Sequence, residues 1–298
     1  MSQNGGTAGT EYPDYTEHDR QYGSFGGGRY LFPVDEAEKD RLDMFHALIT
    51  RARGGLWEVP LPDKPQVLDL GTGTGIWAID VGDKFWEAKN QGQVLGLDLS
   101  LIQPKLIPPC VRFERADVEA PLPTHEQMPT HEQIFDLVHI QMLLGSIRDW
   151  PALYRKSFRQ IKPGGYIEQV EIEWFPRSDD NTLATNSPLA IWGDNLRHAM
   201  HTYGQPIDII DTKKELGAAG FTDITEKVIR LPTNPWSQIP AEEELGRWFN
   251  LGLTHCLEGL TLAPFIRVLR WQRDDVDRLV DDLKKDICRL NVHAYCRM

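Results

Sequence analysis

The chain has few cysteines, no long apolar run and no excess of positive charge, and each absence excludes a class of protein. Its four cysteines show no CxxC spacing and no nearby histidine pattern, which argues against a zinc site and a disulfide framework. No run of about 18 apolar residues is present, so we expect no membrane span. The formal net charge of −12 disfavours direct binding to nucleic acid. The start lacks the hydrophobic stretch of a signal peptide, and we expect an intracellular protein.

What the chain does contain is enough apolar sequence for a packed core, with 41% apolar residues in a length of 298. Residues 1–20 carry almost no aliphatic side chains, and we expect them to be mobile. Asp35 and Glu38 form a capping box that predicts a helix up to Gly54. From Gln66, short apolar strands alternate with helical segments, a pattern typical of a mainly parallel sheet covered on both faces.

The later sequence departs from this alternation. A predicted helix capped by Ser187, with Pro188 at its first position, interrupts the alternation of strands and helices, and we interpret it as an inserted cap. A helix near 211–219, a strand near 221–230, three further helical stretches and a final strand in NVHAYCRM follow.

A short repeat, PTHEQ at 123–127 and 129–133, invites a metal interpretation. The zinc pattern HExxH needs two histidines four apart on a helix, whereas His125 and His131 are six apart and separated by a proline. We interpret the repeat as a duplicated surface loop and predict no metal site.

A glycine-rich turn, VLDLGTGTGIW, follows the first strand of the alternation. Gly71, Gly73 and Gly75 stand between a strand and a helix, where missing β-carbons let the backbone approach a ligand. The spacing is GxGxG and no GK[ST] follows, so turns that cradle phosphates fit less well. The sequence predicts a nucleotide-like cofactor, and an NAD-dependent oxidoreductase remains as an alternative.

Acidic residues follow the next two strands. Asp98 ends VLGLDLS, where a carboxylate can accept both hydroxyls of a ribose, although a solvated acid at a strand end is the alternative. Asp117 comes after VRFERA, where it could meet an adenine amino group while Val118 covers the ring. Both positions lie at strand ends that a parallel sheet brings together.

Two further positions are candidates for chemistry. His139, at the carboxyl end of FDLVHI, is a candidate general base, and a packed core histidine is the alternative. Glu171 shares one strand face with Glu173 and could orient a polar substrate, or both could simply be solvated.

Several stretches resemble the LaeA-like fungal methyltransferases, a family that includes VipC and VapB relatives. The resemblance runs from about Tyr22 to Met298, and it is carried by YGSFGGGRYLFPVDEAEKDRLDMFH, VLDLGTGTGIWAID, GSIRDWPALYRKSF, KPGGYIEQVEIEW, ELGRW and HAY. It implies an α/β class I methyltransferase fold, a Rossmann-like seven-stranded sheet with helices on both faces and an antiparallel last strand. The implied parts are a lid over 22–55, a cofactor-binding core over 64–173, a helical cap over about 174–210, and C-terminal helices with the last strand over 211–298.

The resemblance also implies a cofactor, S-adenosylmethionine (SAM), with S-adenosylhomocysteine (SAH) as product. The family's cofactor contacts fall on Asp69, Gly71, Thr72, Gly73, Gly75, Asp98, Leu99, Asp117, Val118 and His139, with Tyr22 and Tyr30 in the segment over the pocket. A simple hydrophobic lid explains the two tyrosines as well. Relatives usually read His-Ile-Arg after the fourth strand, but this chain has Gln141 in place of the arginine. This departure removes a charge beside the expected methyl donor and puts the substrate preference in doubt.

The resemblance finally implies a regulator of fungal development or secondary metabolism in the nucleus or cytoplasm. Velvet-type or other regulatory proteins are the expected partners, and the methyl acceptor is not specified. Two alternatives remain open at this point. One is a small-molecule methyltransferase acting on a carboxylate, hydroxyl or amine, and the other is a SAM-binding scaffold with little turnover.

Overall fold

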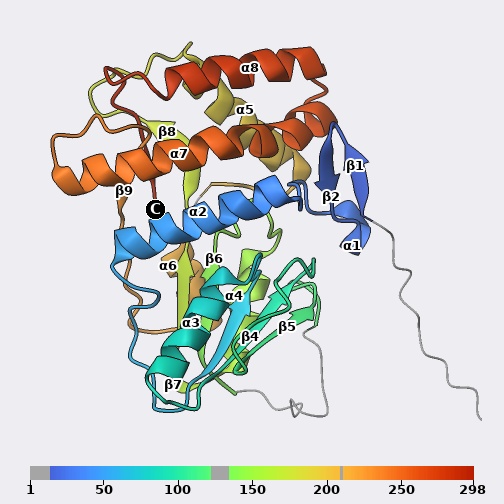
Figure 1. The fold of residues 1–298 in the computed structure, drawn as a ribbon, viewed down its shortest axis with the longest axis vertical. Helices are drawn as coiled ribbons and strands as arrows, with labels where there is room; N and C mark the ends of the chain where they lie inside the picture. The colour runs from blue at the N-terminus through green and yellow to red at the C-terminus, as the bar shows by residue number, and fades with distance from the viewer. Residues whose placement is uncertain (1–13, 122–133, 209–210) are drawn as a thin grey trace, which may run out of the picture.

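The computed structural model describes residues 14–121, 134–208 and 211–298 and shows a sheet layer beneath a layer of long helices (Figure 1). The sheet is parallel and five-stranded, in the order β5 (Val111–Arg115), β4 (Gln93–Asp98), β3 (Gln66–Leu70), β6 (Phe135–Gln141) and β7 (Ile161–Val170). β3 and β6 are buried along almost their whole length, which matches their continuous apolar sequence. The parallel pairing brings the carboxyl ends of β3, β4, β5 and β6 to one edge.

Three helices belong to the sheet layer: α3 (Ile76–Glu87), α4 (Trp150–Gln160) and α6 (Thr212–Ala219). Gly75 begins α3 in a left-handed conformation with φ 79°, so the glycine turn leads directly into this helix. The side chain of Asp149 caps α4 by accepting a hydrogen bond from Ala152 N. The βα alternation predicted from Gln66 onward is confirmed by the sheet and these helices.

The second layer contains helices from distant parts of the sequence: α2 (Glu36–Arg53), α5 (Pro188–Tyr203), α7 (Pro240–Ala263), the π-helix η1 (Pro264–Val268) and α8 (Arg273–Asp286). Asp35 and Ser187 cap their helices as predicted, since Asp35 accepts from Glu38 N and Ser187 accepts from Ala190 N. The Glu38 carboxylate pairs with Arg41 instead of completing the capping box. Phe45 of α2 packs edge-on against Phe249 of α7, with ring centroids 6.1 Å apart. A Cβ on Gly252 would lie 3.0 Å from Phe45, so glycine lets these two helices approach closely.

The predicted single seven-stranded sheet is divided in two among the described residues. β7 ends at Val170, and β8 (Glu173–Arg177) begins a separate three-stranded sheet with β10 (Tyr295–Arg297) and β9 (Arg230–Pro232). The last strand, β10, is antiparallel to both neighbours, as predicted. The strand expected over 221–230 is confined to its end, and the preceding residues form no strand.

The chain enters the fold through a hairpin of β1 (Tyr15–Glu17) and β2 (Arg20–Tyr22), followed by the short helix α1 (Phe25–Gly28). Within the described residues, the structure contains no helix with the length and apolarity needed to cross a membrane. The PTHEQ repeat lies outside the described residues.

Candidate functional site

A cavity of about 110 Å³ lies at the carboxyl ends of β3, β4, β5 and β6. Strand order reverses beside β3, and in open parallel sheets ligands bind at such a switch point. The lining residues come from the glycine turn, the three other strand ends, and the segments before α2 and after α5. The residues used below are Arg29, Tyr30, Leu42, Gly71, Gly73, Asp98, Leu99, Ser100, Asp117, Val118, Glu119, Gln141, Leu143, Ser146 and Gln205.

The glycine turn after β3 forms the floor of this cavity. Gly71 and Gly73 have φ of 70° and 56°, a region that residues with a Cβ rarely adopt. A Cβ on Gly71 would lie 2.3 Å from Leu143, so only glycine fits there. A Cβ on Gly73 would meet only Leu42, at 3.4 Å, and therefore faces space that a ligand can use. The turn thus allows the close backbone approach that a nucleotide-like cofactor requires.

On the β4–β5 side of the turn, carboxylates line the cavity. Asp98 accepts hydrogen bonds from Gly73 N at 2.8 Å and Ser100 N at 2.9 Å. These bonds leave acceptor positions free on both oxygens, which suits the two hydroxyls of a ribose. Burial raises the pKa of Asp98 to about 6. Asp117 accepts from Glu119 N at 2.8 Å and from the Arg29 guanidinium at 3.3 Å. We call Asp98, Asp117 and Glu119 the carboxylate end.

On the β6 side, the polar lining groups are neutral. Gln205 is 2% exposed, and its Nε2 donates to the backbone oxygen of Ser146 at 3.0 Å. The Oε1 atoms of Gln141 and Gln205 are buried and have no hydrogen-bond partner among the described residues. We call Gln141, Ser146 and Gln205 the amide end. Unpaired amide oxygens there suit a ligand that carries a positive charge or an N–H donor.

Three predicted site residues support the turn from behind and do not line the cavity. Asp69 is 3% exposed and accepts from the Thr72 hydroxyl at 2.6 Å, while its other oxygen lies 2.8 Å from His139 Nδ1. The His139 ring is fully buried and stacks on Trp77 at 3.5 Å with an interplanar angle of 2°. This burial fits the alternative of a packed core histidine, and a role for His139 as a general base stays a prediction.

The two predicted tyrosines lie in different parts of the structure. Tyr30 lines the cavity, and burial raises its pKa. Tyr22 is buried elsewhere, with its ring stacked on Tyr15 at 5.6 Å and the Arg267 guanidinium 4.4 Å from its centroid. Tyr22 belongs to the packing between the N-terminal hairpin and η1 and is not among the lining residues of the cavity, so its prediction as a cofactor contact gains no support there.

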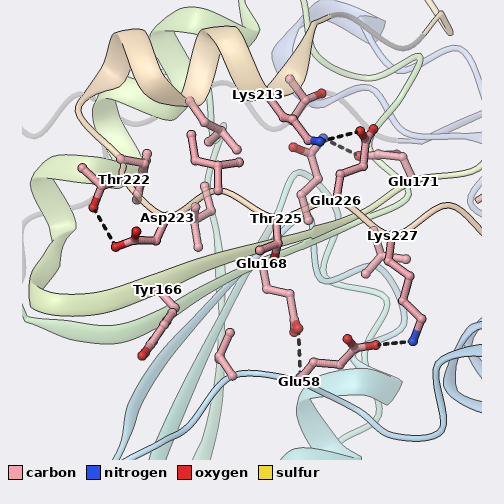
Figure 2. Close-up of a pocket in the computed structure, with 18 of the residues that line it drawn as sticks. Glu58, Tyr166, Glu168, Glu171, Lys213, Thr222, Asp223, Thr225, Glu226 and Lys227 are labelled. Atoms are coloured by element: carbon pink, nitrogen blue, oxygen red, sulfur yellow. Dashed lines mark hydrogen bonds and ion pairs between the residues drawn. The ribbon is translucent and has the colours of Figure 1, made fainter.

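Glu171 lies in a second, larger cavity and is labelled in Figure 2. Its carboxylate accepts from Leu143 N at 3.2 Å and Leu144 N at 3.0 Å, so it holds the turn that follows β6. Burial raises the pKa of Glu171 to about 7. Glu171 is not among the lining residues of the cofactor cavity but holds the turn that lines it, and its predicted catalytic role stays a prediction. Glu173 instead pairs with Arg177 at 2.5 Å.

Some lining residues carried no sequence signal. Gln205 follows the glycine that ends α5 and contacts Ser146 across 59 residues of sequence. Glu119 accepts from Arg148 N and Asp149 N, both at 2.9 Å, and ties the loop after β5 to the start of α4. No spacing rule marks either position, because each depends on where a distant helix packs.

Comparison with known proteins agrees with this site. The family described as methyltransferase domain matches residues 38–226. The secondary metabolism regulator LAE1 of Cochliobolus heterostrophus is 42% identical over 304 residues, covering 99% of the chain and 96% of that protein. The protein-methionine methyltransferase laeA of Emericella nidulans is 42% identical over 286 residues, covering 94% of the chain and 74% of that protein.

A further relative, the secondary metabolism regulator laeA of Aspergillus flavus, is 41% identical over 290 residues, covering 95% of the chain and 75% of that protein. These identities extend over nearly the whole chain and include both the sheet layer and the helical layer. The residues at the carboxyl ends of β3, β4 and β5 fit the cofactor that such enzymes use. The chain belongs to the LaeA family and is a SAM-dependent methyltransferase.

Proposed function

We propose that this enzyme methylates the thioether sulfur of a methionine in a protein, and thereby acts in the regulation of secondary metabolism. The observation that carries the proposal is the chemistry of the amide end. Its polar side chains are neutral, no histidine is among the described residues that line the cavity, and His139 is fully buried behind the glycine turn. The relative from Emericella nidulans, whose name is protein-methionine methyltransferase, supports the same acceptor.

The proton balance of the reaction explains why the acceptor matters. A hydroxyl or ammonium acceptor must lose a proton, which requires a base near the acceptor atom. A thioether has a free electron pair and no proton, so the new S–C bond forms without any proton transfer. SAM supplies a methyl group on a positively charged sulfur, and the leaving S–C electron pair stays on that sulfur. The positive charge passes from one sulfur to the other.

The amide end suits this charge transfer. The unpaired Oε1 atoms of Gln141 and Gln205 carry partial negative charge in a buried place. Such dipoles stabilise a cation without neutralising it. They can therefore stabilise the positive charge on the donor sulfur before the methyl transfer and on the acceptor sulfur after it. Gln205 is held by its bond to Ser146, which fixes the position of its oxygen.

Seven of the residues predicted to contact the cofactor line the same cavity, which supports an assignment of each part of SAM to particular residues. We assign the ribose to Asp98 and Leu99, the adenine to Asp117 and Val118, and the methionyl part to Gly71 and Gly73, with Tyr30 as cover. Asp69, Thr72, Gly75 and His139 shape the turn from behind.

The alternatives make different demands. A small-molecule acceptor calls for a pocket of about 300 Å³ or more beneath the cap. The larger cavity, of about 1050 Å³, lies along β7, and none of the described residues of the cap over 174–210 lines it. A scaffold would bind SAM without turnover. Velvet-type partners and a nuclear or cytoplasmic location rest on the family resemblance.

The test is a methyl-transfer assay with the purified chain, SAM labelled on its methyl group, and short peptides that differ at one position. We expect label on a peptide with methionine and none on its norleucine counterpart, which has the same shape but no sulfur. The rate should stay flat between about pH 7 and about pH 9, because no proton leaves the acceptor. Faster labelling of lysine or serine peptides would overturn the acceptor, and SAM binding without any labelling would support the scaffold.

A further inference from the structure

An exposed arginine, Arg148, lies beside the amide end of the cofactor cavity. It stands two residues after Ser146, which belongs to that end. Its guanidinium lies over the ring of Tyr203, 5.7 Å from the centroid. Tyr203 comes two residues before Gln205 of the amide end, and its hydroxyl donates to Arg29 O at 3.1 Å. Arg148 and Tyr203 therefore form part of the rim of the cavity.

The guanidinium of Arg148 has no carboxylate partner within the described residues. Other exposed arginines of this acidic chain do have one, as Arg112 has in Glu114 at 2.9 Å. The acids beside Arg148 are engaged in other ways. Glu119 accepts from the main-chain N–H groups of Arg148 and Asp149, and the side chain of Asp149 caps α4. The rim thus offers cationic N–H donors that no acceptor in the described structure uses.

The contact with Tyr203 leaves these donors available. A guanidinium placed over an aromatic ring uses its face for that contact, and its N–H groups lie in the plane of the group. The bond from the Tyr203 hydroxyl to Arg29 O holds the ring in place, so Arg148 has a fixed support. In-plane N–H groups bind a carboxylate through two parallel hydrogen bonds. Arg148 is therefore suited to receive a carboxylate.

The proposed reaction gives a reason for a carboxylate at this rim. Methyl transfer to a thioether leaves a positive charge on the acceptor sulfur. An acidic residue of the same segment would offset this charge and could pair with Arg148 at the same time. Successive residues of an extended segment lie about 3.3 Å apart, so a residue within three positions of the methionine can reach the rim.

We propose that Arg148 binds a carboxylate of the acceptor protein, so that methionines with an aspartate or glutamate within three positions are the preferred acceptors. This inference rests on the proposed methionine acceptor and adds a requirement on the sequence around it. The net charge of −12 opposes acidic partners in general. Only a segment that brings its carboxylate to Arg148 gains from the charge, which makes the preference a local one.

The first test measures binding without any reaction. The enzyme saturated with SAH is titrated with blocked seven-residue peptides that have norleucine at the centre and glutamate, glutamine or lysine at one flanking position. We expect the glutamate peptide to bind about two- to five-fold more tightly than the glutamine peptide, and the lysine peptide to bind most weakly. The differences should shrink at about 1 M salt. Equal binding of the three peptides at every flanking position, or no binding, would overturn the inference.

Charge reversal of the arginine distinguishes recognition from a structural role. Arg148→Glu should reverse the order, so that the lysine peptide binds more tightly than the glutamate peptide. Arg159 is the matched control, because it is exposed in the last turn of α4 and also has no ion pair in the described structure. Arg159→Glu should keep the wild-type order. The same reversal in both variants would assign the preference to overall charge and overturn the role of Arg148.

Turnover separates this inference from the proposed function. With methionine peptides and labelled SAM, glutamate in place of glutamine should lower KM by about two- to five-fold at similar kcat, because Arg148 lies at the rim and not at the reacting sulfur. A binding preference without any labelled methionine would refute the methionine acceptor and support the carboxylate-binding rim. Labelling of all methionine peptides with equal KM would support the methionine acceptor and overturn the role of Arg148.

Discussion

The two ends of the cofactor cavity hold their polar groups in different ways. At the carboxylate end, Asp98 and Asp117 are charged groups whose oxygens already accept main-chain N–H groups. At the amide end, Gln141 and Gln205 are neutral, and one oxygen of each has no partner in the described structure. Main-chain groups hold the carboxylates in place before a ligand arrives, whereas the two amide oxygens have no partner among the described residues.

This difference separates binding from chemistry. Fixed carboxylates favour hydroxyl and amino donors of a nucleoside and contribute mainly to affinity. Neutral amide oxygens near a sulfonium add little affinity, but they lower the energy of a charge that moves during the reaction. Substitutions at the carboxylate end should therefore change the affinity for SAM. Substitutions at the amide end should change the affinity for charged SAM relative to neutral SAH.

The largest expected effect comes from the turn that both ends share. Gly73→Leu should weaken SAM binding by about 100-fold or more, because the new side chain points into the cavity. Gly54→Leu is the matched control, since Gly54 has φ 78° and open space around it at the end of α2. Both variants carry the cost of a left-handed residue, about 1–2 kcal/mol of unfolding free energy. Calorimetric titration should separate them, and similar SAM affinities would remove the turn from the cofactor site.

The second-largest effect is expected for Asp98, the carboxylate that contacts the glycine turn. Asp98→Asn should weaken SAM binding by about 10- to 100-fold, since a charged acceptor contributes about 1.5–3 kcal/mol. Burial raises the pKa of Asp98 to about 6, so below this pH the carboxylate gains a proton and loses acceptor strength. Wild-type affinity should fall as the pH drops through about 6, while the Asn variant stays flat. A parallel fall in both proteins would assign the titration to another group.

A smaller effect is expected behind the turn, where His139 contacts Asp69. His139→Phe keeps a ring against Trp77 but removes the contact at Nδ1, and should lower the unfolding free energy by about 1–3 kcal/mol. His139→Asn offers an amide N–H in a similar place and should recover part of that loss. Turnover with a methionine peptide should change by no more than a few-fold in both. Loss of turnover in the Asn variant at unchanged stability and SAM affinity would restore His139 as a base.

The carboxylate end could be predicted because its residues stand at the ends of adjacent parallel strands. Gly73, Asp98 and Asp117 each follow a strand that the local sequence marks clearly, and parallel pairing then brings them together. Strand sequence alone did not place His139 correctly. β6 continues two residues further to Gln141, so His139 lies inside the ladder, opposite Asp69.

The amide end and the division of the sheet could not be predicted, because both depend on contacts between segments that lie far apart in the sequence. Gln205 reaches the cavity because α5 packs in the helical layer, where Trp192 donates to Thr261 of α7 at 2.9 Å. That contact joins segments 69 residues apart, and no local pattern encodes it. The division of the sheet likewise depends on the place of β10, which pairs with β8 and β9 and not with β7 in the described part of the chain.

The smallest expected effect tests the amide end directly. Gln141→Arg introduces the arginine that the family resemblance implies at this position and places a cation where the sulfonium of SAM is expected, whereas SAH is neutral at that atom. Gln141 is partly buried as a residue, and solvent around such a site reduces the repulsion between two charges several ångströms apart to about 1 kcal/mol. We therefore expect the ratio of SAM to SAH affinity to fall by about two- to five-fold, measured by titration with both ligands. Gln141→Met is the control, because it keeps the length of the side chain, removes the amide oxygen and adds no charge. Its ratio should fall by less than that of the Arg variant. An unchanged ratio in both variants would show that Gln141 lies away from the sulfur, and the charge argument for a thioether acceptor would then rest on Gln205 alone.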